Sequence, residues 1–147
     1  MPGIIVGIDG SAHSRRALEW AATEAALRHV PLTVLTVHQA LAGWAGPVAY
    51  PGDADLTEQA HKAAQEAADD VLEKMAAGNR PPSVTVEALN GFPPVELLKA
   101  AGDADMIVVG SRGTGGFSRL LLGSVSTQIV HHAHCPVVVI PSERAEG

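Results

Sequence analysis

Short runs of β-branched and other apolar residues alternate along this chain with longer alanine-rich segments, and this alternation limits the possible folds more than any other feature. The strand-like runs cover residues 3–9, 32–38, 83–89, 104–110 and 136–140. The helix-like segments start at Ser14, Asp55, Pro94 and Ser124. Three of the strand-like runs are almost continuously apolar, as in strands that are buried on both faces of a parallel sheet. We therefore expect a doubly wound, three-layer α/β sandwich with a five-stranded parallel sheet in the order 3-2-1-4-5.

The helix-like segments carry apolar residues at helical spacing. In the first, Leu18, Ala22 and Ala25 fall on one face. In the second, Gly78 is expected to be the C-cap. The expected buried stripe of that second helix consists of Ala60, Ala64, Ala67, Val71 and Met75.

One domain is expected over residues 1–147, because this length can bury a single core and 46% hydrophobic against 18% charged residues is a globular composition. The formal net charge is −6 and the Lys and Arg residues form no basic block, which argues against a nucleic-acid partner. No signal region and no run of 18 apolar residues occurs, and Cys135 is the single cysteine. These features predict a cytoplasmic protein that binds neither nucleic acid nor membrane.

A sheet of this kind binds ligands beyond the carboxyl ends of its strands, where the strand order reverses. In the expected order this point lies between the first and fourth strands. The segments that leave those strands are IDGSAHS and GSRGTGGFS, the turns richest in small residues in the chain. Sequence and topology therefore indicate the same place for a ligand.

The glycine-rich segment after the fourth strand is neither of the two common phosphate loops. Gly116 and Phe117 stand where a Walker A loop needs Lys and Ser or Thr. After the first strand, Gly7, Gly10 and Ser11 do not supply the G-x-G-x-x-G of a Rossmann loop. What remains is the spacing G-x2-G-x9-G-[ST], formed by Gly110, Gly113, Gly123 and Ser124.

This spacing suits phosphate binding. Two glycines after a strand let the backbone approach an anion without a Cβ in the way. Gly123 and Ser124 stand at the expected start of the last helix, where free N–H groups and the helix dipole favour a phosphate. The alternative is ordinary turn chemistry, to which glycines at a strand-to-helix connection often belong.

The motif and its surroundings resemble the ATP-binding subset of the universal stress protein family. The resemblance rests on the four-position motif, SRLLLGSVS, HCPVVVI, GIDGS, LTVLTVH and DADMIVVGSRG, so it extends over essentially the whole chain. It implies ATP as the ligand, with ADP, AMP or cyclic AMP as alternatives, and Mg held with the phosphates and not by protein side chains. It also implies a homodimer built through the last strand, 136–140.

The resemblance assigns roles to individual residues as well. Asp9 would lie near the ribose or base, and the Val37 backbone would address the adenine. Asp9 has the alternative role of capping the first helix, and Arg112 that of an ordinary solvated side chain. Thr127 departs from the acidic residue that many relatives carry there, which weakens the cap of the last helix. The ribose and phosphates would be held by Gly110, Gly113, Gly123, Ser124 and Val125, with Arg112 and Ser126 near the phosphate tail.

Three further patterns have a structural interpretation beside a functional one. HHAHC, residues 131–135, contains zinc-ligand residue types but lacks a second ligand pair, so we interpret it as a helix end. Asp9, Ser11 and His13 crowd within five positions without a nucleophile-elbow pattern, which is typical of a turn. Residues 41–55 form a long connection that is either a lid over the ligand or a variable loop.

The sequence thus predicts an adenine-nucleotide-binding stress-response protein that acts as a ligand-linked sensor or regulator. We expect slow ATP hydrolysis at most and assign no catalytic residue, because the chain offers no P-loop lysine and no evident base for water. The alternative is a dimeric interaction protein of the same fold that binds no nucleotide. Two other classes stay open, although the residues count against both. An adenine-nucleotide α-hydrolase would carry an SGGxDS-like loop where DGSAHS stands, and a receiver domain would carry an acidic pair after the first strand and a lysine after the fifth.

Overall fold

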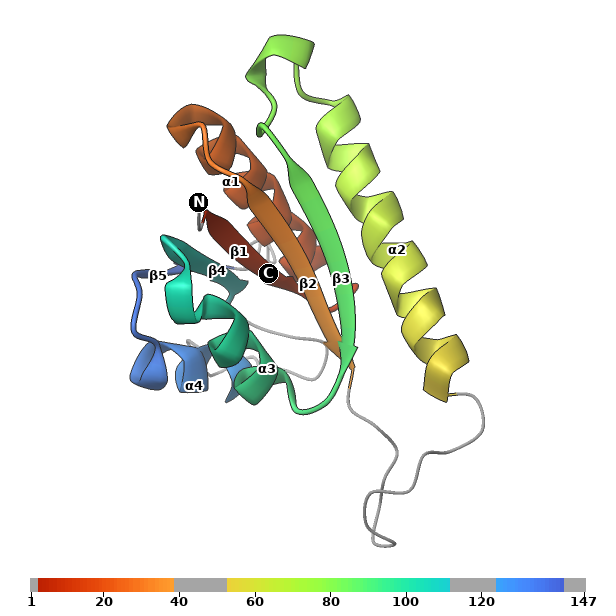
Figure 1. Cartoon of the computed structure of the whole chain (residues 1–147), viewed down its shortest axis with the longest axis vertical. Coiled ribbons are helices and arrows are strands. Elements are labelled where there is room, and N and C mark those ends of the chain that lie inside the picture. The colour runs from red at the N-terminus through yellow and green to blue at the C-terminus, as the bar shows by residue number, and fades with distance from the viewer. Residues whose placement is uncertain (1–2, 39–52, 112–123, 142–147) are drawn as a thin grey trace, which may run out of the picture.

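The computed structural model describes residues 3–38, 53–111 and 124–141. Its strands are all parallel and form one sheet in the order β3-β2-β1-β4-β5 (Figure 1), so the expected fold class and strand order are confirmed. The elements in chain order are β1 (Ile4–Ile8), α1 (Ala12–Arg28), β2 (Leu32–His38), α2 (Asp53–Glu73), the 3-10 helix η2 (Ala77–Asn79), β3 (Val84–Asn90), α3 (Pro93–Ala100), the 3-10 helix η3 (Ala101–Asp103), β4 (Met106–Gly110), α4 (Ser124–His132) and β5 (Val137–Ile140).

The sheet separates two apolar cores, because successive side chains of a strand point to opposite faces. On one face, α1 and α2 pack against Ile4, Val6 and Ile8 of β1, and we call this the first core. On the other face, α3 and α4 pack against Ile5 and Leu35, in the second core. Figure 1 shows α3 and α4 side by side at the lower left and α2 beside β3 on the right. Each such aliphatic side chain contributes about 1.5–3 kcal/mol by its burial.

α1 begins at Ala12, earlier than the expected start at Ser14, because Ser11 is its N-cap. The Ser11 hydroxyl accepts a hydrogen bond from the Ser14 N–H at 3.2 Å. Ser14 turns its own hydroxyl back and donates to the Ser11 carbonyl at 3.0 Å. The expected inner face of the helix is confirmed, since Leu18, Ala22 and Ala25 are all buried.

α2 ends at Glu73, so the expected C-cap at Gly78 is wrong. The Met75 N–H bonds to the Leu72 carbonyl, one residue closer than in an α-helix, and the helical ladder closes there. Ala76 then has extended backbone angles, φ −60° and ψ 142°, and Gly78 lies in η2.

The expected buried stripe of α2 holds in part. Ala64 and Val71 are buried, whereas Ala60, Ala67 and Met75 are only half-buried. The structure adds one residue to the stripe that was not expected. This residue, Ala68, is 1% exposed, because it faces the sheet more directly than Ala67 does.

α2 contacts the β3 edge of the sheet through His61. The Leu32 N–H bonds to the Ser83 carbonyl, so odd-numbered residues of the β3 segment face β2 and Val86 directs its backbone outward. α2 runs beside this edge (Figure 1), and Nε2 of His61 donates to the Val86 carbonyl oxygen at 3.0 Å.

The β5 edge is different. The Ile107 N–H bonds to the Pro136 carbonyl, so even-numbered residues face β4 while Val137 and Val139 direct their backbone groups outward. In the described part of the chain, no further strand pairs with this edge. Nor does any helix there combine the length and apolar character that crossing a membrane requires.

Candidate functional site

β1 and β4, the two strands at the reversal of the strand order, separate before they end. Their residue pairs stop at Val6 with Val108, although β1 continues to Ile8 and β4 to Gly110. Each strand stays paired to its other neighbour up to its last residue. The sheet therefore splits between the carboxyl ends of β1 and β4, which is where sheets of this kind bind ligands.

Gly110 directs its backbone toward this split. The next residue, Ser111, faces β5, because its N–H donates to the Ile140 carbonyl at 2.8 Å. Backbone polar groups alternate in direction along a strand, so the Gly110 N–H and C=O face β1. They lie past the last pair between β1 and β4.

α4 starts beside the end of β4. Ser126, in its first turn, is 2% exposed, and its hydroxyl donates to the Ser111 carbonyl oxygen at 3.3 Å. Val125 is half-buried against the second core, whereas Ser124 is exposed. Val125 and Ser126 thus anchor the helix start, and the first-turn N–H groups have no partner within the helix. The expected role of Ser126 near a phosphate tail stays a prediction.

Asp9 follows β1 and is held by Ser11. The Ser11 N–H and hydroxyl both donate to Oδ1 of Asp9, at 2.9 and 2.6 Å. Ser11 rather than Asp9 caps α1, which corrects the alternative role of Asp9 as the cap. The carboxylate is exposed at the carboxyl end of β1, beside the split.

Val37 directs its backbone toward the β1 side of β2. The His38 carbonyl accepts a hydrogen bond from the Gly91 N–H at 2.9 Å, so His38 faces β3 and its neighbour Val37 faces β1. The pairs between β1 and β2 end at Ile8 with Thr36. The Val37 carbonyl therefore lies beyond the last pair, at the same end of the sheet as the split.

α3 and α4, the two helices over the second core, both start at this end of the sheet, but their first turns differ in the N–H groups and charge that they present. α3 starts with Pro93 and Pro94, which have no N–H to offer, after Phe92, which is 48% exposed. Glu96 adds a negative charge in its first turn. α4 starts with Ser124 and two further residues that all carry an N–H. An anion is therefore favoured at the α4 start and disfavoured at the α3 start.

Three of the predicted site residues, Arg112, Gly113 and Gly123, lie outside the described residues. So does most of the connection 41–55. Their expected roles stay predictions. The structure brings together the other predicted site residues, which are Asp9, Val37, Gly110, Ser124, Val125 and Ser126, at one end of the sheet.

HHAHC lies at the end of α4, as its interpretation as a helix end requires. Among the described residues, no three His, Cys, Asp or Glu side chains gather as a metal site would need. Burial raises the pKa of the Cys135 thiol above its usual value, although a hydrogen bond with the Ile107 backbone opposes the rise. A metal-binding or nucleophilic thiolate needs a lowered pKa instead.

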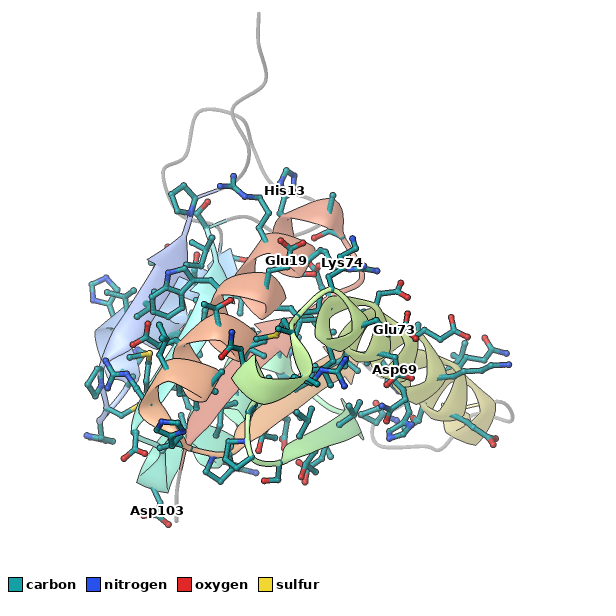
Figure 2. All side chains as sticks on the ribbon, turned by 90° about the horizontal axis from the view of Figure 1, so that it is seen from above. His13, Glu19, Asp69, Glu73, Lys74 and Asp103 are labelled. Atoms are coloured by element: carbon teal, nitrogen blue, oxygen red, sulfur yellow. The ribbon has the colours of Figure 1, made fainter. Side chains whose placement is uncertain are left out.

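His13 sits in the first turn of α1 and projects outward from it (Figure 2). Asp103, the last residue of η3, lies on the opposite side of the molecule in the same view. Sequence reasoning overlooked the roles of the Ser11 and Ser14 hydroxyls, for which a serine three residues before a second serine is the signal. It did predict a proline start for α3, at Pro94, one residue after the observed start at Pro93.

The sequence model of the universal stress protein family matches residues 2–141. The chain belongs to this family. Universal stress protein Rv2005c of Mycobacterium tuberculosis is 41% identical over 146 residues, which cover 97% of this chain and 49% of the relative. The chain thus spans about half the length of the curated relatives it matches.

Solved universal stress protein structures share the fold. UspA from Lactobacillus plantarum is 28% identical with a TM-score of 0.71, over 95% of this chain and 97% of that one. The universal stress protein from Archaeoglobus fulgidus in complex with dAMP is 27% identical with a TM-score of 0.66, over 95% and 98% of the two chains. The family expected from the sequence is confirmed, and its ATP-binding subset stays a prediction.

Proposed function

We propose that this universal stress protein domain binds an adenine nucleotide where β1 and β4 separate, and that it acts as a ligand-linked sensor or regulator. The separation of the two strands after Val6 and Val108 carries the proposal, because it directs the Gly110 backbone into the split beside the α4 start. The dAMP complex of the Archaeoglobus fulgidus relative supports an adenine nucleotide as the ligand class. ATP is the proposed ligand, with ADP, AMP and cyclic AMP as alternatives.

The chemistry around the split favours one orientation of the nucleotide. The phosphates belong at the α4 start, where N–H groups are available and no acidic side chain stands in the first turn. The base belongs toward β2, where the Val37 carbonyl is an acceptor. Adenine offers an amino group to such an acceptor, whereas guanine presents an oxygen at the equivalent position. Neighbouring strands are about 4.8 Å apart, so β2 and β4 stand about 10 Å apart, a span suited to a nucleotide.

Hydrolysis is proposed to be slow at most. Mg would be held by the phosphates, and the chain has Gly116 and Phe117 where a P-loop places its Lys and hydroxyl residue. Binding is then the function, and the ligand acts by favouring one state of the domain over another.

A homodimer through β5 is part of the proposal. Val137 and Val139 direct backbone groups outward from the β5 edge, where no strand in the described part of the chain pairs with them, and such an edge pairs readily with another strand. The same observation favours the second candidate function, that of a dimeric interaction protein without a nucleotide.

Nucleotide content separates the two functions. We expect the purified protein to release an adenine nucleotide on denaturation, or its nucleotide-free form to bind ATP, ADP, AMP or cyclic AMP in a calorimetric titration, with GTP binding more weakly. If none of these binds at about millimolar concentration, which corresponds to about −4 kcal/mol, nucleotide binding is refuted and the interaction protein remains.

A charge at the α4 start tests where the phosphates lie. Ser124→Asp places a carboxylate at the first residue of α4, which favours the helix dipole but repels a phosphate. We expect the affinity for ATP to fall about tenfold or more, corresponding to about 1.4 kcal/mol, without loss of stability.

The matched control is Gln128→Glu, which adds the same charge to an exposed position one turn further along α4. We expect it to change the affinity by less than about threefold, because the dipole and free N–H groups act within the first turn. Equal effects of both variants would place the phosphates elsewhere.

A further inference from the structure

Three side chains of the turn between β1 and α1 form a closed hydrogen-bond network. Ser11 donates its N–H and its hydroxyl to the same atom, Oδ1 of Asp9, at 2.9 and 2.6 Å. The Ser11 hydroxyl also accepts the Ser14 N–H at 3.2 Å. The Ser14 hydroxyl donates to the Ser11 carbonyl at 3.0 Å and accepts the Asp9 N–H at 3.2 Å. Ser14 is buried, so the network ties the exposed Asp9 to the anchored first turn of α1.

The network engages one oxygen of the Asp9 carboxylate and leaves the other available. Both Ser11 donors go to Oδ1, and no donor from the described part of the chain reaches Oδ2. An exposed aspartate without such bonds would populate several rotamers. Here Gly10, with φ +84°, lets the chain turn back so that Ser11 reaches the carboxylate. The side chain is thus oriented before any ligand arrives.

The oxygen that Ser11 does not contact, Oδ2 of Asp9, can accept a hydrogen bond but cannot donate one. An ionised carboxylate oxygen forms its strongest hydrogen bonds with hydroxyl and N–H donors. It stands at the carboxyl end of β1, where the split from β4 begins. A ligand that presents a hydroxyl group there would therefore be bound at little cost in side-chain ordering.

We propose that Ser11 is a positioning residue for the nucleotide: it holds Asp9 through Oδ1, so that Oδ2 accepts a hydrogen bond from a ribose hydroxyl. This inference rests on the proposed function and adds to it the residue that prepares the site. Ser11 acts through Asp9 and does not itself contact the ligand.

The test compares dissociation constants of ATP, 2′-deoxy-ATP and 3′-deoxy-ATP for the full chain and its variants. Wild type should bind at least one deoxy analogue more weakly than ATP. Ser11→Ala is expected to raise the dissociation constant of ATP about three- to tenfold, because Asp9 must then be ordered on binding. Ser11→Thr keeps the hydroxyl and the cap and should bind as wild type does.

Asp9→Asn tests separately whether Oδ2 accepts a hydrogen bond from the ribose. Because Ser11 holds the acceptor oxygen, the amide nitrogen of Asn takes the place of Oδ2 and replaces an acceptor with a donor. We expect this variant to lose the preference for ATP over the deoxy analogue. A preference that survives in Asp9→Asn would overturn the assignment of Oδ2.

The loss of the α1 cap must be separated from the loss of positioning. Urea unfolding measures the first, and Ser11→Gly removes the hydroxyl at a position where glycine is tolerated better than alanine. A double-mutant cycle that combines the Ser11 and Asp9 substitutions measures the loss of positioning. In an Asp9→Ala background, removing the Ser11 hydroxyl should leave the dissociation constant of ATP unchanged, whereas an equal loss in both backgrounds contradicts a positioning role.

The outcomes distinguish this inference from the proposed function. A wild type that binds no adenine nucleotide refutes both. A wild type that binds ATP, with Ser11→Ala and Ser11→Gly binding equally well, refutes the positioning role alone.

Discussion

Gly3 is required both by its backbone conformation and by its surroundings. Its φ is +106°, and a Cβ there would overlap the Pro31 carbonyl oxygen. That oxygen is already the acceptor for the Ile4 N–H at 2.9 Å, which joins β1 to the start of β2. Gly3 also exchanges two hydrogen bonds with Asp105, one of them from its own N–H to Oδ2 at 3.0 Å. The close approach of three chain segments therefore depends on the missing side chain.

Gly3→Ala should lower the free energy of unfolding by about 2–5 kcal/mol, since it combines a strained φ with a clash against backbone. Urea unfolding followed by circular dichroism measures the change. Gly102→Ala is the control, because nothing lies within 4 Å of a Cβ at that position and its φ is not positive. We expect the control to stay within about 0.5 kcal/mol of wild type, and a similar loss in both variants would contradict the role of Gly3.

α2 approaches the sheet closely because its inner face consists of small side chains. Ala64 and Ala68 are buried against the first core, whereas Ala63, on the same helix, is exposed. Protein cores are packed as densely as organic crystals, so these positions have no room for additional atoms. Charged side chains such as Asp69 and Glu73, labelled in Figure 2, lie on the exposed side of the helix.

Ala68→Leu should destabilise the protein by about 1–3 kcal/mol, because three added carbon atoms overpack the contact between α2 and the sheet. Ala63→Leu makes the same change in the same helix at an exposed position and should cost less than about 0.5 kcal/mol, since leucine and alanine have similar helix propensities. Thermal or urea unfolding of the pair measures the difference. The absence of a difference would mean that the inner face of α2 is not tightly packed.

The two edges of the sheet differ in how they meet solvent, and this difference governs assembly. His61 of α2 bonds to the β3 edge, whereas no strand in the described part of the chain pairs with the backbone groups that Val137 and Val139 direct outward from β5. Sheet edges without a neighbouring strand are where strands of another chain add. Association of two copies of this domain should therefore occur through β5 and not through β3.

Val139→Pro should convert the expected dimer into a folded monomer, because it removes an N–H that points outward while the bonds to β4 stay in place. Light scattering after size exclusion measures the mass, and circular dichroism checks the fold. Val138→Pro is the contrasting variant, since its N–H faces β4 and the loss of a ladder hydrogen bond should destabilise the domain by about 1–3 kcal/mol. A dimeric Val139→Pro protein would place the interface elsewhere.

Much of the fold could be predicted from periodicity, and the differences have local causes. The apolar run 32–38 coincides with β2, and the stretch from Ser124 to His132 coincides with α4. The start of α1 was misplaced because the choice between Ser11 and Ser14 as the cap depends on hydroxyl geometry. Ala68 was overlooked because spacing alone does not say how far a buried stripe extends around a helix.

Some features of the candidate site could likewise be predicted from the sequence, and others required the structure. The spacing from Gly110 to Ser124 and the place of Asp9 follow from the sequence, because glycine turns and helix starts are properties of neighbouring residues. The direction in which the Val37 and Gly110 backbone groups point cannot be predicted from the sequence, since it depends on which strand each residue faces. The network that holds Asp9 likewise requires side-chain positions in three dimensions.

Local periodicity and turn chemistry therefore suffice for the kind of sheet, for the segments that form its helices and for the end of the sheet at which we propose the ligand. The tertiary arrangement adds the separation of β1 from β4 after Val6, the hydrogen bond of His61 to the β3 edge, and the anchoring of α4 by Ser126. The physical reason is distance along the chain. Contacts such as that between Gly3 and Asp105, 102 residues apart, are decided by the packing of the whole domain and leave no periodic signal in either segment.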